Sequence, residues 1–382
     1  MSSKTRILFD SRYVARGGAE IFMTNVINYL PRDRYDITIA AIYWDKNDPN
    51  EKLPPDVHFI KRYHRRKHYR RLTPLWFLDV TYGRVYDALI SWYISILNFD
   101  IAIATQEKQT MACTDKIRAK RKFAWVHTDY NTRLDKNTGT LFRTAEEERE
   151  CMARFEKVAC VSKTTLDSVI AAIGDPGNLC VKYNPIDVRR IRELSQAACP
   201  LSRANDRPLL VSVGRLVAEK NYMLLLEACR LLKNSLDFDV WLVGDGEERP
   251  MLEDYIKKED LHFVKLVGTQ SNPFQYLKQA DLFVSTSVTE GYGLAVQEAL
   301  VLGVPVIAAD CPGIAESLDP RFGMLTSHSA KAFAAALKKM LEPQTLAEYR
   351  QRIAREYPAD ELFESRLKAI TALWENSAAD KQ

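Results

Sequence analysis

The chain has 382 residues, too many for one ordinary hydrophobic core, and roughly 150 residues per domain gives two or three domains. Its 46% hydrophobic and 27% charged residues are typical of globular proteins and exclude a largely disordered or fibrous chain. The net charge is +4, but residues 61–71 carry seven Lys/Arg and leave the rest of the chain at −3 (4 minus 7). This distribution permits a local basic patch and excludes a wholly basic nucleic-acid binder.

The cysteines and the apolar runs favour a soluble cytoplasmic protein. The seven cysteines are odd in number, widely spaced and without a CxxC pair, which indicates reduced thiols. Met1 leads almost directly into a strand-like run, so we expect no signal peptide. The longest uncharged apolar stretch, residues 88–99, has 12 residues, whereas a membrane span needs about 20.

Short apolar runs alternate with helical patterns along the first half of the chain. Helices are expected at 19–30, 75–97 and 164–173. Strands are expected at 6–10, 36–43, 57–60, 101–105, 123–127, 158–162 and 180–183.

The same rhythm continues in the second half, with strands expected at 209–214, 240–244, 263–268, 282–287 and 304–309. Strands that are apolar on both faces and alternate with helices predict an α/β fold of two doubly wound parallel sheets with a cleft between them. Asn184-Pro185 and the polar residues 204–208 mark the boundary. We therefore expect domains at 1–185 and 186–355, and a final helical segment at 356–382 that packs back on the first domain.

Ligands of parallel sheets bind outside the carboxyl ends of the strands, where the strand order reverses. The residues that follow the predicted strands are therefore candidates for a binding site. They are Gly17, Gly18, His127, Arg215, Lys220, Gly244, Gly268, Glu290, Gly291, Tyr292, Gly293, Leu294 and, one helix further, Glu298.

Two carboxylates eight residues apart suit a ligand rich in hydroxyl groups. Glu290 lies in a glycine-rich loop before a helix whose free N–H groups favour anions. Glu298 lies on that helix, 294–302, which is apolar on nearly every face, and a buried carboxylate there is costly unless something binds it. The alternative, that Glu298 lies at a solvent edge beside Gln297, stays open.

Cationic and ring side chains at the strand ends also have two interpretations each. Arg215 and Lys220, beside a helix N-cap at Asn221, fit a diphosphate clamp. The alternative, which the residues taken alone favour, is two exposed charges with Glu219 neutralising Lys220. His127 is either a structural residue or a group in the cleft. The glycine pairs 17–18 and 244–246 are either close-approach points for a phosphate or plain turns.

We expect no metal and no cofactor. The six histidines do not cluster, and the one DxD pattern, Asp237-Phe238-Asp239, precedes its strand and so lies at the wrong edge of the sheet. Neither GxSxG nor a P-loop is present.

The segments VGRLVAEKN (213–221), LVGDGEE (242–248) and TEGYGLAVQEALVLGVPVIAAD (289–310) together resemble glycosyltransferase family 4, the retaining nucleotide-sugar transferases of GT-B fold. The spacing from Glu290 to Glu298 is similar to the EX7E motif of that family, and GGAE at 17–20 resembles its N-terminal glycine loop. Asn184-Pro185 and Pro312-Gly313 depart from the family pattern, which has Asn-Gly and Gly-Gly there.

The resemblance implies an acceptor-binding first domain and a nucleotide-sugar-binding second domain. It implies Arg215 and Lys220 on the donor diphosphate, Glu298 on the ribose hydroxyls, and Glu290 with the following amides facing the transferred sugar. It also implies Gly18 near the phosphates and His127 beside the sugar ring. Fixed cations that stabilise the leaving diphosphate would take the place of a divalent metal.

The basic run is a candidate for contact with an anionic membrane through Arg65, Arg66, Lys67, Arg70 and Arg71. Such contact would place the enzyme in the cytoplasm or peripherally on the inner face of the membrane, near a lipid-linked acceptor. The alternative is a solvated basic loop before a core helix. Aromatic residues follow the run: Trp76, Phe77, Tyr82, Tyr86, Trp92 and Tyr93.

The leading hypothesis is a metal-independent, retaining glycosyltransferase that uses a nucleoside-diphosphate sugar, a UDP-sugar by preference, to build a surface glycan or glycolipid. A nucleotide-sugar epimerase of the same architecture would convert the donor without an acceptor. A non-catalytic nucleotide-binding protein would bind the donor and leave it intact. The sugar, the base, the acceptor and the oligomeric state are not encoded in motif spacing.

Overall fold

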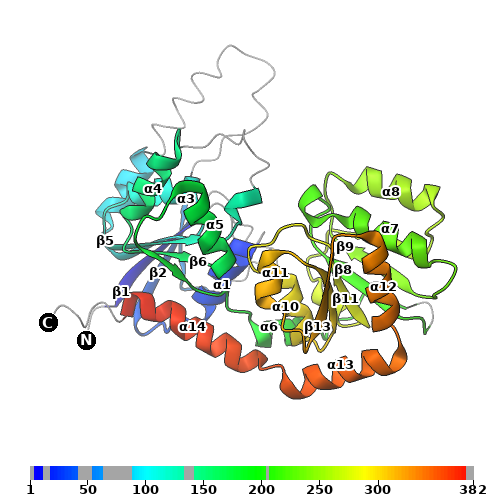
Figure 1. Cartoon of the computed structure of the whole chain (residues 1–382). Helices are drawn as coiled ribbons and strands as arrows, with labels where there is room; N and C mark the ends of the chain where they lie inside the picture. Colours follow the sequence, from blue (N-terminus) through cyan, green and yellow to red (C-terminus); the bar gives the residue numbers. More distant parts are fainter. Residues whose placement is uncertain are drawn as a thin grey trace, which may run out of the picture. The chain divides into compact units, whose positions relative to one another are not determined.

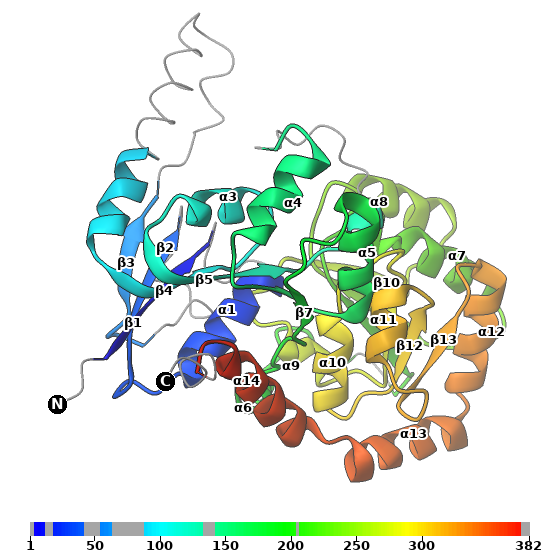
Figure 2. The same cartoon turned by 60° about the vertical axis from the view of Figure 1, so that its left-hand side comes forward.

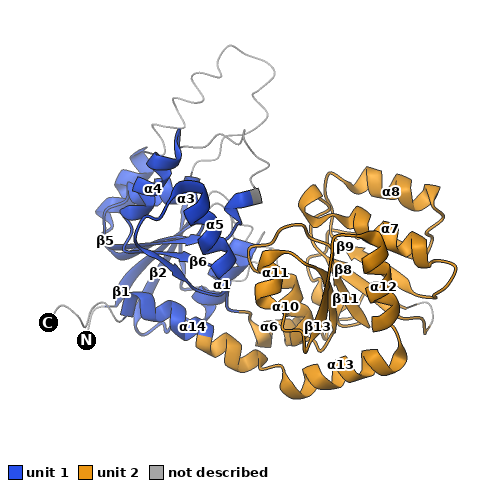
Figure 3. Ribbon diagram, viewed as in Figure 1, with its two compact units in different colours: residues 1–185, 366–382 blue, residues 186–365 orange. Residues whose placement is uncertain are grey.

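A computed structural model describes residues 4–11, 18–41, 54–62, 88–132, 142–203 and 206–375. The chain divides into two compact units, residues 1–185 with 366–382 and residues 186–365 (Figure 3). The first boundary coincides with the expected one, and the return to the first unit comes at 366 rather than 356 because α14, Ala359–Glu375, runs from one unit into the other. Each unit is a parallel α/β layer structure (Figure 1), as the sequence predicts.

The first unit contains a parallel sheet in the order β3-β2-β1-β4-β5-β6-β7 (Figure 2). Its strands are β1 Thr5–Asp10, β2 Tyr35–Ala41, β3 His58–Lys61, β4 Phe99–Ala104, β5 Ala119–Val126, β6 Lys157–Cys160 and β7 Leu179–Val181. Its helices are α1 Gly18–Tyr29, residues 88–96, α3 Gln109–Asp115, α4 Ala145–Ala153 and α5 Lys163–Ile173. Of the helix expected at 75–97, residues 75–87 lie outside the described residues, as do residues 42–43 of the second expected strand.

Successive side chains of β5 point to opposite faces of the sheet, and helices cover both faces. Ala124 and Val126 belong to a core cluster with side chains of α3, α4 and α5. Trp125 packs in the opposite direction, with its ring centroid 5.2 Å from Phe22 of α1 and 6.4 Å from Trp374 of α14. The buried second half of β5, residues 123–126, is accordingly apolar at every position, whereas the three residues before it are charged and not buried.

The C-terminal helix α14 is attached to the first unit by polar contacts as well as by Trp374. The Arg121 guanidinium donates to the Trp374 carbonyl at 2.5 Å and to the Leu373 carbonyl at 3.2 Å, so it caps the end of the helix. The Tyr35 hydroxyl donates to Glu375 at 2.8 Å. Tyr357-Pro358 separates α14 from α13, Pro343–Glu356.

The second unit contains a parallel sheet in the order β10-β9-β8-β11-β12-β13. Its strands are β8 Leu209–Val213, β9 Asp239–Val243, β10 Val264–Gly268, β11 Leu282–Ser285, β12 Val306–Ala309 and β13 Gly323–Thr326. Its helices include α6 Val188–Leu194, α7 Tyr222–Leu232, α8 Arg249–Lys258, α9 Phe274–Leu277, α10 Leu294–Val301, α11 Pro312–Ser317 and α12 Ala330–Met340, with a 3-10 turn at Ala218–Lys220. One face of the sheet packs on α7 and α12, and the other packs on α9, α10 and α11.

The remaining sequence expectations concern cysteines and membrane spans. All seven cysteines lie in the described ranges, and none of them forms a disulfide. No helix among the described residues combines the length and the apolar character that crossing a bilayer requires.

Candidate functional site

The strand order of the second unit reverses between β8 and β11. The chain runs from β8 through β9 to β10 on one side, then crosses β8 and continues through β11, β12 and β13 on the other side. Such a reversal opens a crevice at the carboxyl ends of the two central strands. The loops that leave these two strands are residues 214–221 and 286–293, and they carry most of the predicted site residues.

Lys220 and Glu290 form an ion pair at this reversal point. Ser287 donates to the same Glu290 oxygen at 2.9 Å, and the Thr286 hydroxyl donates to the Lys220 carbonyl at 2.9 Å. The side chains of Lys220 and Glu290 are 24% and 20% exposed, so solvent reaches both. The partner of Lys220 is therefore Glu290, 70 residues along the chain, and not the neighbouring Glu219.

A small cavity of about 10 Å³ lies against this pair. Its lining includes Ser212, Tyr222 and Thr286 as well as Lys220 and Glu290. This volume corresponds to about one water molecule. A nucleotide is far larger, so a nucleotide at this position must contact the pair from the solvent side.

Arg215 follows β8 and is exposed. Its guanidinium makes no ion pair or side-chain hydrogen bond to any part of the chain that the structure describes, so it is available to an anionic ligand. The expected N-cap at Asn221 is made by the backbone alone. Asn221 adopts a left-handed conformation with φ 47° between the 3-10 turn and α7, and its side chain makes no capping hydrogen bond.

Three of the predicted glycines are explained by backbone packing. A Cβ on Gly244 would lie 1.8 Å from the Gly214 carbonyl oxygen, which no side chain allows. The Gly244 N–H donates to the Gly268 carbonyl at 3.0 Å, and Gly268 has φ +82°. Gly293 is the N-cap of α10 at φ +70°. These glycines shape the strand ends, and their contact with a donor remains a prediction.

Gly313, which follows the Pro312 that departs from the family pattern, also has a definite role in the structure. A Cβ at this position would lie 1.9 Å from the Glu290 carbonyl oxygen. The first turn of α11 therefore rests on the backbone of Glu290, and only glycine permits this contact. Sequence reasoning did not assign Gly313 to the site.

Glu298 lies on α10, where it is half-buried, and its carboxyl group makes no hydrogen bond to the residues of the described ranges. Burial raises the pKa of its carboxyl group to about 7, and the charge of Arg190 on α6 partly opposes this shift. The neighbour Gln297 is the more deeply buried residue and bonds to Ser317 and Tyr357. The structure thus brings Lys220 and Glu290 together, whereas no contact among the described residues joins Glu298 to them.

His127 lies in the first unit, directly after β5. Burial lowers the pKa of its imidazole to about 4, although the charge of Glu107 and a hydrogen bond to the Thr105 backbone oppose the shift. The ring is therefore neutral at pH 7. Its Nε2 atom is buried without a hydrogen-bond partner in the described part of the chain, and a hydroxyl group of a ligand could satisfy it.

Two residues that follow β4, Gln106 and Glu107, were missed in the sequence. Glu107 accepts from the His127 backbone N–H at 3.1 Å and from the Thr128 hydroxyl at 2.6 Å. Gln106 donates to Glu20 of α1 at 2.6 Å. Both follow the expected strand at 101–105, so the position after that strand was the available signal.

Several predicted residues cannot be compared with the structure. Gly17 and the basic residues lie outside the described residues, and Gly18 is the first residue of α1. The basic residues concerned are Arg65, Arg66, Lys67, Arg70 and Arg71. Asp239 begins β9, which places the DxD pattern at the amino edge of the sheet, as expected.

Two family models match successive parts of the chain. The model for Glycosyltransferase Family 4 matches residues 16–190, and the model for Glycosyl transferases group 1 matches residues 200–357. These ranges include the loops at 214–221 and 286–293, and they meet near the boundary between the two units.

Curated relatives match shorter parts of the chain. An N-acetylgalactosamine-N,N'-diacetylbacillosaminyl-diphospho-undecaprenol 4-alpha-N-acetylgalactosaminyltransferase of Campylobacter jejuni is 30% identical over 48% of this chain and 50% of its own length. The lipopolysaccharide core biosynthesis glycosyltransferase LpsD of Rhizobium meliloti is 30% identical over 42% of this chain and 49% of its own. The chain thus spans about a third to a half of the length of such relatives.

A solved structure matches nearly the whole chain. Anabaena HepE, crystallised in complex with UDP and glucose, superposes with a TM-score of 0.76 at 20% identity, over 97% of this chain and 99% of its own. This likeness concerns the fold. It shows the GT-B fold, and the two family models, which together match most of the chain, show that the chain belongs to the family 4 glycosyltransferases.

Proposed function

We propose that the protein is a retaining, metal-independent glycosyltransferase that moves a sugar from a UDP-sugar to a glycan or lipid-linked acceptor. The product would be a surface polysaccharide or glycolipid. The observation that carries the proposal is the pairing of Lys220 with Glu290 at the point where the strand order reverses. A cation for the diphosphate and a carboxylate for sugar hydroxyls are thereby presented side by side.

The chemistry of transfer explains why a cation is needed there. The bond between the anomeric carbon and the diphosphate oxygen breaks, and negative charge develops on the diphosphate. Lys220 and Arg215, which is exposed and has no ion-pair partner in the described ranges, would stabilise that charge more strongly in the transition state than in the ground state. Because these two fixed cations take the role of a divalent metal, we propose that transfer is metal-independent.

Retention requires the acceptor to attack from the face that the diphosphate leaves. The acceptor oxygen forms its bond to the anomeric carbon, and its proton passes to an oxygen of the departing diphosphate. The second carboxylate, Glu298, belongs to α10, and no hydrogen bond within the part of the chain that the structure describes joins it to Glu290. We therefore assign it to the ribose hydroxyls and not to a covalent sugar intermediate. His127 would accept a hydrogen bond from a sugar hydroxyl through its unpartnered Nε2 atom.

The substrates named for similar proteins support the substrate classes. HepE was crystallised with UDP and glucose, which favours uridine as the base. The Campylobacter jejuni relative acts on an undecaprenol-linked sugar, and LpsD acts in lipopolysaccharide core biosynthesis. We extend these classes to the present chain, together with a peripheral position on the inner face of the membrane.

The donor is tested by a thermal-shift screen of UDP, GDP, ADP and their sugar conjugates, with and without EDTA. A tight ligand raises the melting temperature by mass action, so UDP or a UDP-sugar should give the largest shift and EDTA should not change it. Loss of the shift in EDTA would contradict metal independence. A larger shift with GDP or ADP would contradict the choice of uridine.

Catalysis is tested by replacing Glu290 with Ala, with Glu364→Ala on the exposed surface of α14 as the matched control. Acceptor-dependent turnover should fall at least a hundredfold in Glu290→Ala, while UDP still binds within several-fold of wild type. NMR of the product should show the anomeric configuration of the donor. Rapid conversion of the donor without acceptor would indicate an epimerase and refute the proposal.

A further inference from the structure

The helix at residues 88–96 of the first unit presents an apolar face to solvent. Leu89, Trp92, Tyr93 and Ile96 are 58%, 64%, 45% and 52% exposed. Their spacing of three, four and seven residues places them on one side of the helix. We call these four side chains the apolar stripe. Isolated exposed apolar residues are ordinary, but four contiguous ones that include a tryptophan mark an interaction surface.

The opposite face of this helix is firmly packed, so the exposure of the stripe does not come from a loose helix. Ile94 is fully buried in a core cluster with Leu8, Phe99 and Ala102, and Ile90 packs against that cluster. The Ser95 hydroxyl donates to the Ser91 carbonyl at 2.7 Å within the helix. The helix therefore has one face in the protein core and a second apolar face that the core does not use.

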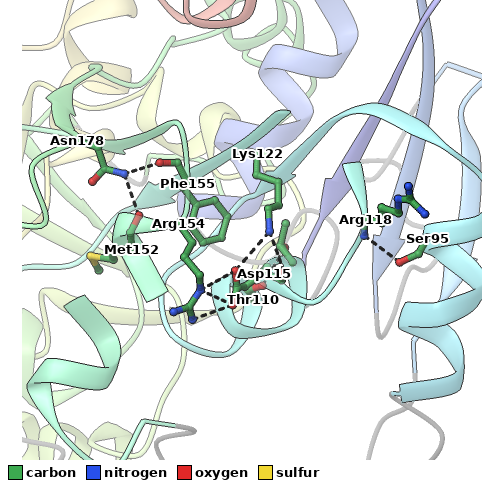
Figure 4. A network of polar contacts seen from close by, with 10 residues as sticks. Ser95, Thr110, Asp115, Arg118, Lys122, Met152, Arg154, Phe155 and Asn178 are labelled. Atoms are coloured by element: carbon green, nitrogen blue, oxygen red, sulfur yellow. Dashed lines mark hydrogen bonds and ion pairs between the residues drawn. The ribbon is translucent and has the colours of Figure 1, made fainter. Parts of the chain in front are cut away.

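Uncompensated positive charge lies beside the stripe. The Arg118 backbone N–H donates to the Ser95 hydroxyl at 2.9 Å, which joins the segment 116–122 to the helix (Figure 4). Arg118 and Lys116 are exposed and form no ion pair with any described residue. Lys120 and Lys122 of the same segment are compensated by Asp100 and Asp115.

The sequence around the helix increases this positive charge. The helix residues 88–96 carry no charge, and residues 63–87, which precede them in the chain, contain six Lys/Arg against two Asp. An uncharged stripe with Trp and Tyr, next to free cations, has the composition of segments that lie at the interface of an anionic bilayer.

We propose that the apolar stripe is a docking surface for a lipid bilayer that contains anionic lipids, with Arg118 and Lys116 contacting the headgroups. The area favours this occupant over a second copy of the chain. The exposed parts of the four side chains amount to roughly 500 Å², whereas each partner of a stable dimer buries about 800 Å². The inference rests on the peripheral membrane position proposed above and names the surface that would provide it. Vesicle binding needs neither donor nor acceptor, so its failure is distinguishable from a failure of glycosyl transfer.

Vesicle co-sedimentation of the full-length protein tests the proposal. Vesicles of phosphatidylcholine alone and with 30% phosphatidylglycerol would be compared for wild type, Trp92→Glu, Trp92→Phe and Leu231→Glu. Leu231, 42% exposed on α7 of the second unit, is the matched control. Far-ultraviolet circular dichroism and the melting temperature would show that each variant is folded.

Wild type should bind anionic vesicles at least tenfold more tightly than neutral ones. Trp92→Glu should weaken this binding at least tenfold, Trp92→Phe and Leu231→Glu should retain it, and Arg118→Gln should weaken it about fivefold. Brominated lipids should quench wild-type fluorescence more than that of Trp92→Phe.

The proposal is overturned if wild type binds neither kind of vesicle. It is overturned as well if Trp92→Glu binds vesicles as tightly as wild type, while binding is abolished by neutralising Arg65, Arg66, Lys67, Arg70 and Arg71. It is also overturned if sedimentation velocity shows a dimer that Trp92→Glu dissociates while vesicle binding is unchanged. That last result would assign the stripe to a second copy of the chain.

Discussion

Replacing Glu298 with Gln should stabilise the ligand-free protein and weaken its binding of the donor. The carboxyl group of Glu298 is buried on α10 without a hydrogen bond among the described residues, and burial raises its pKa to about 7 from 4.5. An ionised carboxylate at this position therefore costs folding free energy that a neutral amide does not. A carboxylate that lowers the stability of the ligand-free protein is expected of a residue that binds a ligand.

The magnitude follows from the pKa difference. A difference of about 2.5 between folded and unfolded states corresponds to about 3 kcal/mol, at 1.36 kcal/mol per pKa unit. Glu298 is half-buried and partly solvated, so we expect a net penalty of about 1–3 kcal/mol. Because the folded protein binds the proton more tightly, this penalty grows as pH rises from 4.5 to 7 and is complete above pH 7.

Urea unfolding at pH 4.5 and pH 8 measures this penalty. Glu298→Gln should be more stable than wild type by about 1–3 kcal/mol at pH 8 and by less than about 0.5 kcal/mol at pH 4.5. The exposed Glu364→Gln on α14 is the control and should change stability by less than about 0.5 kcal/mol at both pH values. In calorimetry, Glu298→Gln should bind UDP about tenfold more weakly, since a carboxylate accepts stronger hydrogen bonds than an amide.

Equal stability of wild type and Glu298→Gln at pH 8 would refute this reasoning. A gain of the same size at both pH values would also refute it, because the gain would then have no connection with ionisation. Unchanged UDP affinity, in a variant that is stabilised as expected, would separate the buried charge from ligand binding and remove Glu298 from the donor site.

Three further perturbations follow from the packing. Gly313→Ala should lower the free energy of unfolding by about 1–3 kcal/mol and weaken UDP binding at least tenfold, because the new methyl group collides with the Glu290 carbonyl. An unchanged UDP affinity in calorimetry would exclude that contact. His127→Gln should reduce the loss of stability as pH falls from 6.5 towards 4, because the wild-type imidazole takes up its proton mainly in the unfolded protein. The same pH dependence of the free energy of unfolding in wild type and variant, measured by urea unfolding, would contradict this. Trp374→Ala should lower the free energy of unfolding by about 3–5 kcal/mol, whereas Trp92→Ala, at an exposed position, should lower it by less than about 0.5 kcal/mol. Equal losses of stability in the two variants would contradict the packing of α14.

The sequence predicts the strands well because parallel strands are covered on both faces and read as continuous apolar runs. Twelve of the thirteen described strands overlap an expected one. The exception is β13, Gly323–Thr326, which has four residues of which only Gly323 is buried. It is held by backbone pairing with β12, from Val306↔Gly323 to Ala309↔Thr326, and such pairing leaves little trace in side-chain composition.

The site was predictable in part. Lys220 and Glu290 follow strands that the sequence reveals, and the rule that ligands bind at carboxyl edges assigns them to one place. The closeness of Gly313 to the Glu290 backbone could not be predicted, because it depends on the angle at which α11 leaves its strand. The same holds for Glu107, whose contact with His127 requires β4 and β5 to be neighbours.

Long-range polar pairs are the least predictable feature of the fold. Arg62, after β3, donates to the Asp10 carboxylate at the end of β1 at 2.7 and 2.6 Å, and Thr114 of α3 donates to it at 2.9 Å. Burial raises the pKa of Asp10, and the Arg62 charge opposes this shift. Neither residue stands out in the sequence, since β2 separates their strands in the sheet and only the assembled sheet brings them into contact.

The central claim is that the cation at the reversal of strand order binds the donor diphosphate. Calorimetric titration of UDP in EDTA, with wild type, Lys220→Met and the exposed control Lys338→Met, tests it most directly. Wild type and Lys338→Met should bind UDP equally, and Lys220→Met should bind it at least tenfold more weakly. Equal affinity of all three proteins, or no binding of UDP by the wild type, would contradict the assignment.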